Sequence, residues 1–385
     1  MMNCTGLSMI RAIGLGLSVA LLGSCSKSNY SSGPFTPAAQ VNPSLDQQVI
    51  ERAYRQGEAN DFFAISGSQL NQDLILMGFE RFMALQRGVL LNRQLRDNFT
   101  ALGYFQQTTK AGLAELCDQN REFLALAAAT SSLADRPKGY PVDTIRCVSG
   151  DIVVAVPLGY DAKIFAVSPL NTFAQSIDLK VLAEASRKAN GNLRWSDLNP
   201  EWPARQVRWA FPVHMPFATH MQRLGVQLPD DLLLSSNYTK IFDAANNDPD
   251  ILIYSFFSPT LNARLRGSDF RILPVQNGRF GSPVMPSVQT IKKTYPEILE
   301  TEIMLFINTS RPKSCIGLSF ADFLLTFNEL ILYEQNMAPL SPETRNKTLA
   351  RLRQIEVTDD SQLIPFCQAV AQFSAFDKPS VGFDQ

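Results

Sequence analysis

The chain of 385 residues is poor in histidine, with only His214 and His220. It also lacks the patterns G-x-S-x-G, H-E-x-x-H and G-x-x-x-x-G-K-[ST], which mark common nucleophilic, zinc and phosphate-transfer sites. The carboxylate pairs Asp230-Asp231 and Asp359-Asp360 are neighbours in sequence, which is typical of solvated loops. We therefore expect no enzyme, and no resident cofactor or metal ion.

An excess of either charge is also missing, since 35 basic residues face 36 acidic ones and the net charge is −1. This balance argues against a nucleic-acid partner and against a polybasic membrane surface. The sequence has no fixed-period repeat and no heptad run, which excludes solenoid and fibrous architectures.

The first residues have the layout of an export signal. Arg11 is followed by an uncharged apolar run over residues 12–22, shorter than the roughly 20 residues of a membrane-spanning helix. The run ends in Leu22-Gly23-Ser24-Cys25, which resembles the bacterial lipobox. The resemblance implies removal of residues 1–24 and a lipid anchor on Cys25; the alternative is an ordinary signal peptide with an incidental cysteine.

This reading places the protein in the cell envelope, facing the periplasm. Ser26 stands where an aspartate would retain a lipoprotein at the inner membrane, so the outer membrane is favoured if the source is Gram-negative. Residues 25–44 carry the lipidated cysteine and a linker rich in small and polar residues, with little to bury. The 361 residues that remain after cleavage are enough for two domains.

Four cysteines remain in this oxidising compartment: Cys117, Cys147, Cys315 and Cys367. Their spacing suggests the pairs Cys117–Cys147 and Cys315–Cys367, although four cysteines allow three connectivities. Zinc is the weaker alternative, because none of the four forms a C-x-x-C pair.

A strand, a turn of small residues and a helix are predicted near the start of the ordered part. The strand-like piece Phe62–Ile65 meets Ser66-Gly67-Ser68, and a pattern follows in which Ile75, Phe79 and Phe82 share a helical face. This geometry points free backbone N–H groups at a ligand. The serines serve equally well as a turn and a helix cap.

Short apolar, β-branched runs recur along the rest of the chain and alternate with helical stretches. This pattern predicts a mixed α/β architecture with buried central strands. The runs cover 152–156, 163–167, 251–257, 270–275 and 302–307. A later stripe from Phe320 to Ile331 has helical spacing and is expected to be core packing.

Two motifs then suggest a family. Residues 157–164 read P-L-G-Y-D-A-K-I, and residues 195–203 read W-S-D-L-N-P-E-W-P. In this order and spacing they resemble the periplasmic phosphate-binding proteins of ABC importers, with weaker likenesses at 247–255, 270–278 and 295–308. The similarity covers roughly residues 60–335.

The resemblance implies a two-lobed α/β fold of the type II periplasmic-binding-protein class, with a hinge and a ligand cleft between the lobes. We expect one discontinuous lobe from 45–160 and 268–385, and a second from 161–267. In the family, loops of hydroxyl and N–H donors hold the anion. The expected ligand-binding residues are Ser66, Gly67, Ser68, Thr130, Ser131, Ser132 and Arg136.

A third loop departs from the family. Where the family has Thr-Ser-Gly-Thr-Arg-Asp, this chain has His214-Met215-Pro216-Phe217-Ala218-Thr219. The change removes hydroxyl donors and a charged pair, each charge-assisted bond being worth about 1.5–3 kcal/mol. Two hypotheses follow: a lipid-anchored protein that delivers phosphate or another small oxyanion to an ABC permease, and a degenerate scaffold that acts as an envelope interaction lipoprotein.

Overall fold

The computed structural model describes most of the chain between Phe62 and Ile355. The described ranges are 62–92, 101–106, 109–118, 125–130, 143–213, 215, 217–235, 238–265, 269–277, 281–311 and 314–355. The expected signal peptide, Cys25 and the linker lie outside these ranges, as do Ser131, Ser132, Arg136 and Cys367.

One large mixed sheet organises the fold, with the strand order β2-β1-β3-β12-β5-β9-β7-β8. Its first part consists of β1 (Phe62–Gly67), β2 (Ala101–Gln106), β3 (Ala125–Thr130), β4 (Asp143–Arg146), β5 (Ile152–Val167), β12 (Glu300–Asn308) and β13 (Ala338–Pro339). Strand β1 pairs in parallel with β2 and β3, whereas β12 is antiparallel to both β3 and β5. Strands β4 and β13 pair antiparallel with β5.

The second part of the sheet pairs with the far end of β5. It consists of β7 (Arg208–Pro212), β8 (Leu233–Ser235), β9 (Ile251–Phe256) and β10 (Arg271–Leu273). Strand β7 is parallel to β8 and β9, and β9 is antiparallel to β5. Strands β6 (Ile177–Asp178) and β11 (Val275–Gln276) form a separate two-stranded sheet.

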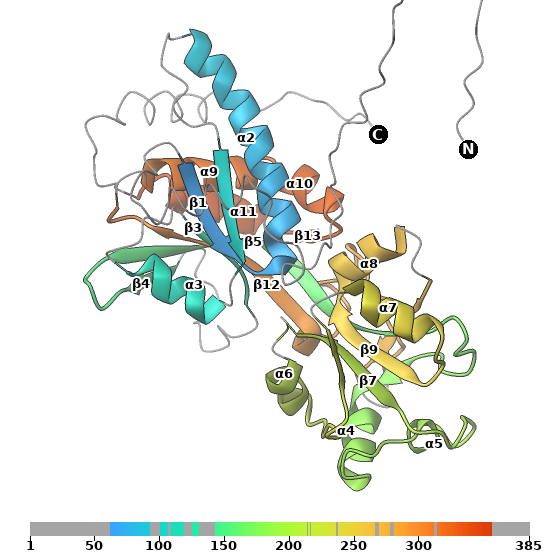
Figure 1. Ribbon diagram of the computed structural model, residues 1–385. Helices are drawn as coiled ribbons and strands as arrows, with labels where there is room; N and C mark the ends of the chain where they lie inside the picture. Colours follow the sequence, from blue (N-terminus) through green and yellow to red (C-terminus); the bar gives the residue numbers. More distant parts are fainter. Residues whose placement is uncertain are drawn as a thin grey trace, which may run out of the picture. The chain divides into compact units, whose positions relative to one another are not determined.

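Strand β5 connects the two parts. The apolar runs at 152–156 and 163–167, expected as separate strands, are the two ends of this one strand of 16 residues. The strand passes Pro157, which has no N–H to donate, through a shift in register: Ile303 of β12 pairs with Gly159 and Met304 pairs with Pro157. Figure 1 shows β5 and β12 running side by side.

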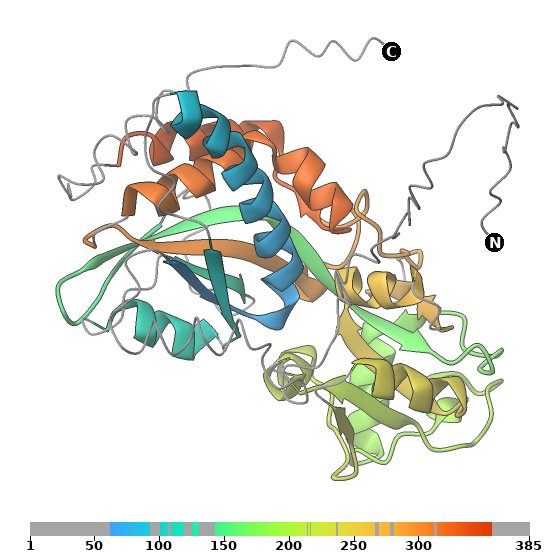
Figure 2. The same ribbon diagram turned by 45° about the horizontal axis from the view of Figure 1, so that its top comes forward.

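Helices cover both faces of the first part. Figure 2 shows α2 and the orange helices α9, α10 and α11 on one face of the strands, and α3 on the other. These helices are α2 (Gln72–Asn92), α3 (Thr109–Leu116), α9 (Ser314–Thr326), α10 (Asn328–Glu334) and α11 (Pro342–Leu352), with the short 3-10 turns η2 (Gln69–Asn71) and η3 (Glu297–Leu299) before α2 and β12.

The side chains of β5 and β12 alternate between these two faces, as the two-residue period of a strand requires. Val154 and Leu305 lie in one core with Phe79 and Phe82 of α2, whereas Val153 and Phe306 lie in another with Leu116 of α3. Both faces are apolar and buried, which explains why these strands read as continuous hydrophobic runs.

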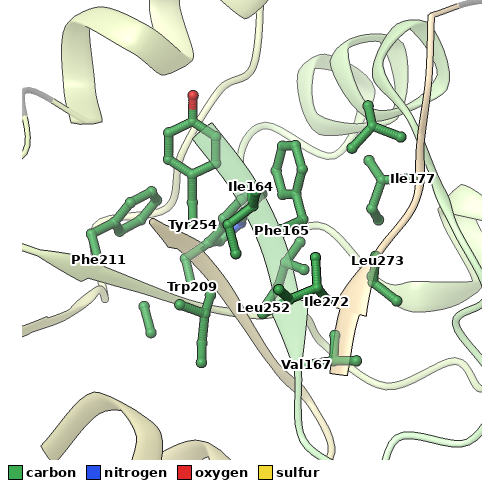
Figure 3. Packing of buried hydrophobic residues seen from close by; sticks show 14 of the residues in the cluster. Ile164, Phe165, Val167, Ile177, Trp209, Phe211, Leu252, Tyr254, Ile272 and Leu273 are labelled. Atoms are coloured by element: carbon green, nitrogen blue, oxygen red, sulfur yellow. The ribbon is translucent and has the colours of Figure 1, made fainter. Parts of the chain in front are cut away.

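The second part has its own core. Figure 3 shows Phe165 of β5, Trp209 of β7 and Tyr254 of β9 packed together with Leu273 of β10. The surrounding helices are α4 (Leu179–Lys188), α5 (Trp195–Leu198), α6 (Phe217–Leu224), α7 (Tyr238–Asn246) and α8 (Phe257–Leu265). Helix α4 starts where Asp178 accepts hydrogen bonds from the N–H groups of Lys180 and Val181.

The predicted lobe boundaries remain a proposal, and the packing suggests one adjustment. Phe270, Ile291, Tyr295 and Leu299 all pack in the second core, although the expected return to the first lobe is at residue 268. A division by core packing would place that return near Glu300, where β12 begins.

The disulfide Cys117–Cys147 is confirmed, with Cα atoms 5.5 Å apart. It joins the end of α3 to the turn after β4. Cys315 is in the first turn of α9, and its side chain lies outside the described ones. The pair Cys315–Cys367 therefore stays a prediction.

The stripe from Phe320 to Ile331 is divided between two helices. Helices α9 and α10 are bent by 80° between Ile316–Thr326 and Asn328–Glu334. Phe320, Leu324 and Ile331 are buried, as expected of core packing. No single helix in the described ranges is long and apolar enough to span a membrane. This bent pair has that length and apolar composition only when its two helices are taken together.

Candidate functional site

The turn after β1 has the predicted geometry. Ser66 and Gly67 are the last residues of β1, and Ser68 precedes the 3-10 turn that leads into α2. The side chain of Ser66 is 1% exposed, and its hydroxyl has no hydrogen-bond partner among the described residues. A buried hydroxyl without a partner is costly, and here it stands near the end of a strand, six residues before α2 begins at Gln72.

Of the second predicted loop, the structure describes only the first residue, Thr130. Thr130 ends β3, the parallel neighbour of β1, so both turns lie at the carboxyl ends of adjacent strands. Ser66 pairs with Leu126, and Thr130 lies four residues further, roughly 13 Å along the strand at about 3.3 Å per residue. The ligand roles of Thr130, Ser131, Ser132 and Arg136 remain proposals.

The third loop belongs to the apolar core where the structure describes it. Met215 is buried, and the ring of Phe217 stacks on that of Phe211 with centroids 4.5 Å apart. His220 on α6 is buried beside Tyr254, with ring centroids 6.4 Å apart. Burial, with the nearby charges of Lys163 and Arg223, lowers the pKa of His220 to about 3, so this imidazole is neutral near pH 7.

A group of buried polar side chains lies where β5 passes between the two cores. Asp161 accepts hydrogen bonds from the hydroxyl of Ser258 at 2.6 Å, and from the backbone N–H groups of Ser258 at 3.2 Å and Ala162 at 2.7 Å. Ser258 is in the first turn of α8, so the carboxylate occupies the positive end of that helix. Burial outweighs these bonds and raises the pKa of Asp161 to about 6.

Lys163, two residues further, is one of the largest fully buried side chains. Its Nζ donates to the carbonyl oxygen of Glu300 at 3.2 Å, and its other two donors have no acceptor among the described residues. Burial and the nearby charge of Arg223 together lower the pKa of Lys163 to about 7, against the attraction of Asp161 and Glu300. The ammonium form is thus only partly compensated by the protein.

Two hydroxyls without partners share the face of the sheet that carries Lys163. Tyr254 pairs with Phe165 across β5 and β9, and Thr301 pairs with Asp161 across β12 and β5. Residues 161, 163 and 165 alternate onto one face, and directly opposite residues share it. The hydroxyls of Tyr254 and Thr301 are both buried, and neither has a hydrogen-bond partner among the described residues.

The phenol of Tyr254 is oriented away from the apolar core. In Figure 3 its oxygen points away from the labelled aliphatic side chains. Burial raises the pKa of Tyr254, and the neighbouring Tyr295 raises it further. Tyr295 donates from its hydroxyl to the carbonyl oxygen of Lys163 at 2.9 Å, which fixes the backbone of β5 at this point.

This junction site was not predicted from the sequence. Asp161 and Lys163 fell within the motif that resembles the phosphate-binding family, but neither was predicted to bind a ligand. The signal was a lysine between two apolar runs, on the same strand face as the aspartate. The partners Tyr254, Ser258 and Thr301 lie more than ninety residues away in sequence, and only the strand pairing brings them together.

The second family motif is a packing element. Trp195 is fully buried, and its ring lies edge-on to Phe173 and Trp202, with centroids 5.3 and 6.0 Å away. Arg205 covers the ring of Phe173 at 5.5 Å. Within the described ranges, no group of three or more His, Cys, Asp or Glu side chains is placed to hold a metal ion.

Among the comparisons with known proteins, only the one with solved structures finds a likeness, and that likeness is in the fold. No family model matches the sequence, and no curated protein matches it. Among solved structures, a Clostridium perfringens protein described as a phosphate ABC transporter substrate-binding protein, with phosphate bound, has a TM-score of 0.51 and 14% identity. The match covers 73% of this chain and 100% of that one.

An ABC-type phosphate transport receptor from Vibrio cholerae has a TM-score of 0.50 and 11% identity, covering 72% of this chain and 100% of that one. At this identity the likeness concerns the fold. The predicted fold class is confirmed: the chain has the mixed α/β fold of these two-lobed periplasmic binding proteins.

Proposed function

We propose that the chain is a substrate-binding protein of the phosphate-binding type, which captures phosphate or another small oxyanion for an ABC importer. The observation that carries the proposal is the Ser66 hydroxyl, buried and without a partner at the carboxyl end of β1, in a fold shared with phosphate transport receptors. Ligands of open α/β sheets bind at the carboxyl ends of parallel strands.

Capture would use the groups that the first part of the sheet presents. The Ser66 hydroxyl donates to an anion oxygen, and backbone N–H groups at the start of α2 add donors in a favourable helix field. Ser131, Ser132 and Arg136 would contribute from the loop after β3, whereas Thr130, roughly 13 Å beyond the level of Ser66 at about 3.3 Å per residue, would not reach the same anion. We propose that the two lobes close on the anion by bending where β5 and β12 cross between them.

The ligand class is wider than phosphate because of the third loop. Met215 and Phe217 pack in the apolar core, so these two positions offer no hydroxyl in place of the ones that the family uses. Loss of several charge-assisted bonds at about 1.5–3 kcal/mol each would weaken phosphate binding by orders of magnitude unless other residues replaced them.

Attachment to the envelope is the remaining part of the proposal. Lipid on Cys25 and the linker that follows would tether the domain to a membrane, with the outer membrane favoured in a Gram-negative cell. Mass spectrometry of the membrane-extracted protein would test this, since a mature chain that starts before Cys25 or carries no lipid would contradict the anchor.

A second candidate function is an envelope interaction lipoprotein that has kept the fold and lost anion capture. The apolar third loop is the observation that favours it. In that case the protein would bind no oxyanion, and the variant with Met215→Ser, Pro216→Gly and Phe217→Thr together with Ala218→Arg and Thr219→Asp would gain phosphate binding.

Thermal unfolding of the lipid-free protein separates the two candidates. Phosphate, sulfate and related oxyanions are added one at a time, with chloride at matched ionic strength as the control. A binding anion at 100 times its Kd stabilises the folded state by about 2.7 kcal/mol and raises Tm accordingly. The absence of any specific shift across the series would overturn the transport proposal.

A further inference from the structure

Within the described ranges, the chain passes between the two cores twice, and the two passages lie side by side. On β5, Leu158 packs in the core of the first part and Ala162 packs in that of the second. On the way back, Leu299 packs in the second core and Ile303 packs in the first. The start of β12 pairs antiparallel with residues 160–162 of β5, so the two passages form a short ribbon. Bending between the two parts therefore acts on this ribbon.

One lysine contacts both strands of the ribbon. Lys292 belongs to the segment before η3, which packs in the second core through Ile291 and Tyr295. Its Nζ lies 4.9 Å from the centroid of the Tyr160 ring on β5, and 3.1 Å from Oε2 of Glu300, the first residue of β12. The other carboxylate oxygen of Glu300 accepts the backbone N–H of Lys292 at 3.1 Å. Lys292 thus links the second part to each strand of the ribbon.

The backbone of Lys292 has a conformation that depends on these contacts. Its φ is +70°, in the left-handed region that residues with a Cβ rarely adopt. Such a conformation persists where the surrounding structure determines it. Here the N–H and the ammonium of one residue bind the same carboxylate, and only 11% of the Glu300 side chain is exposed. An ion pair with one buried partner is screened less than a pair at the surface.

Tyr160 extends the contact to the first part. Its ring packs against both cores, and its backbone pairs with Ala338 of β13 and with Glu302 of β12. The segment that carries Lys292 also holds β5 at a second point, because the hydroxyl of Tyr295 donates to the carbonyl oxygen of Lys163 at 2.9 Å. The contacts of this segment therefore fix the ribbon relative to the second part.

We infer that Lys292, with Tyr160 and Glu300, is a latch that restrains bending between the two parts. A change in the angle between the ribbon and the second part separates the ammonium from at least one of its two partners, so the latch favours the arrangement in which both contacts are made. Its consequence for affinity rests on the proposed function: closure of the lobes on an anion changes the same angle, and the strength of the latch then contributes to Kd.

Amide hydrogen exchange of the lipid-free protein without ligand tests the latch. Lys292→Met removes the ammonium and keeps the aliphatic stem and the N–H. Amides of residues 159–163 and 300–303 are expected to exchange about three- to tenfold faster in this variant, while those of β7 are unchanged. Lys347→Met is the matched control, because Lys347 pairs with Glu343 at 2.7 Å on α11, outside the ribbon. It should exchange like the wild type at both stretches.

A distance measurement separates bending from local opening of the ribbon. Spin labels at Glu80 on α2 and Glu184 on α4, both exposed, report the separation of the two parts by pulsed electron resonance. Lys292→Met is expected to shift or broaden the distance distribution. Lys292→Arg, which keeps a cation for the Tyr160 ring and for Glu300, should resemble the wild type.

A salt series tests the charge without replacing any residue. Raising NaCl from about 0.05 M to about 1 M shortens the Debye length to about 3 Å, which weakens a partly exposed ion pair. The wild-type distance distribution is expected to change in the same direction as in Lys292→Met, whereas the variant itself should not respond. Packing of the aliphatic stem alone would not produce this difference.

The outcomes are independent of a ligand. Equal exchange and equal distances in the wild type and Lys292→Met would overturn the inference. Faster exchange without a change in distance would overturn it as well, because the lysine would then only support the ribbon locally. The proposed function is decided separately, by the oxyanion series. If sulfate or phosphate binds there, its Kd should differ between the wild type and Lys292→Met, and equal values would overturn the link to affinity.

Discussion

Asp161 on β5 accepts two hydrogen bonds from Ser258 at the start of α8, one from the hydroxyl at 2.6 Å and one from the backbone N–H at 3.2 Å. The two residues are 97 positions apart in sequence. The carboxylate thus acts as a helix cap supplied by a distant strand, and it joins α8 to the strand that passes between the two cores.

This carboxylate makes stability depend on pH in a predictable direction. Burial raises the pKa of Asp161 from 3.8 to about 6, so between these values the folded state binds the proton more tightly than the unfolded state. The contribution of this group to the free energy of unfolding therefore falls as pH rises from about 4 to about 6, and is constant above. Asp161→Asn should remove this component, as measured by urea unfolding at pH 4.5 and pH 7.

Asp243→Asn is the matched control for this experiment, because Asp243 is exposed on α7. It should keep the wild-type difference between the two pH values. An Asp161→Asn variant with the same pH dependence as the wild type would show that the buried carboxylate does not carry the effect.

The disulfide gives a second prediction. Cys117 and Cys147 close a loop with a sequence separation of 30, and cross-linking a loop of this size restricts the unfolded chain by about 3–4 kcal/mol. The double variant Cys117→Ser, Cys147→Ser should lose about that much free energy of unfolding, measured by urea denaturation without reductant. Adding reductant should destabilise the wild type and leave the double variant unchanged; equal stability of both proteins would contradict the entropic account.

The sequence predicted the strands and helices whose patterns are local. The apolar run at 302–307 predicted β12, and the spacing of Ile75, Phe79 and Phe82 predicted α2, because one face of that helix packs on the sheet. The turn at Ser66 was predicted because three small residues, Ser66-Gly67-Ser68, stand between a strand-like piece and a helical pattern.

Two features could not be predicted from local pattern. Pro157 and Gly159 indicated a break between two strands, but β5 continues because a bulge against β12 absorbs the missing N–H. The junction site was missed because a lysine beside an apolar run looks exposed until pairing with β9 and β12 covers it. Such sites depend on strand order, which a single sequence does not specify.

Gly159 gives a third prediction, about close packing at the same strand. A Cβ atom there would lie 2.5 Å from the carbonyl oxygen of Ala338 and 2.8 Å from Cδ1 of Leu332. Since β13 pairs with β5 at this point, the backbone contact has no room to relax. Gly159→Ala should lower the free energy of unfolding by about 1–3 kcal/mol, as overpacking does.

Gly78→Ala is the comparison, because a Cβ at this helical position would meet side chains and no backbone: the tip of Leu324 at 2.7 Å and the ring of Phe320 at 3.7 Å. That side chain can move, and alanine gains up to about 1 kcal/mol of helix propensity over glycine. The loss should therefore be clearly smaller than for Gly159→Ala in the same urea titration. The reverse order would mean that β13 yields more easily than the core around α9.

Replacing Ser66 by alanine distinguishes a role of its hydroxyl in binding from a role in stability. Because the Ser66 hydroxyl has no partner among the described residues, Ser66→Ala removes an unsatisfied buried group and should leave the free energy of unfolding within about 1 kcal/mol of the wild type, or raise it. Ser186 is an equally buried serine on α4 whose hydroxyl donates to Ala183 O at 3.0 Å and accepts from Gln227 N at 3.1 Å. Ser186→Ala should lower the free energy of unfolding by about 1–3 kcal/mol, since it leaves that N–H unpaired.

The response to the anion should show the opposite order of effects: the Tm shift with anion should be reduced in Ser66→Ala and retained in Ser186→Ala. A Ser66→Ala protein that is strongly destabilised and still responds fully to the anion would mean that the serine supports the turn and takes no part in binding.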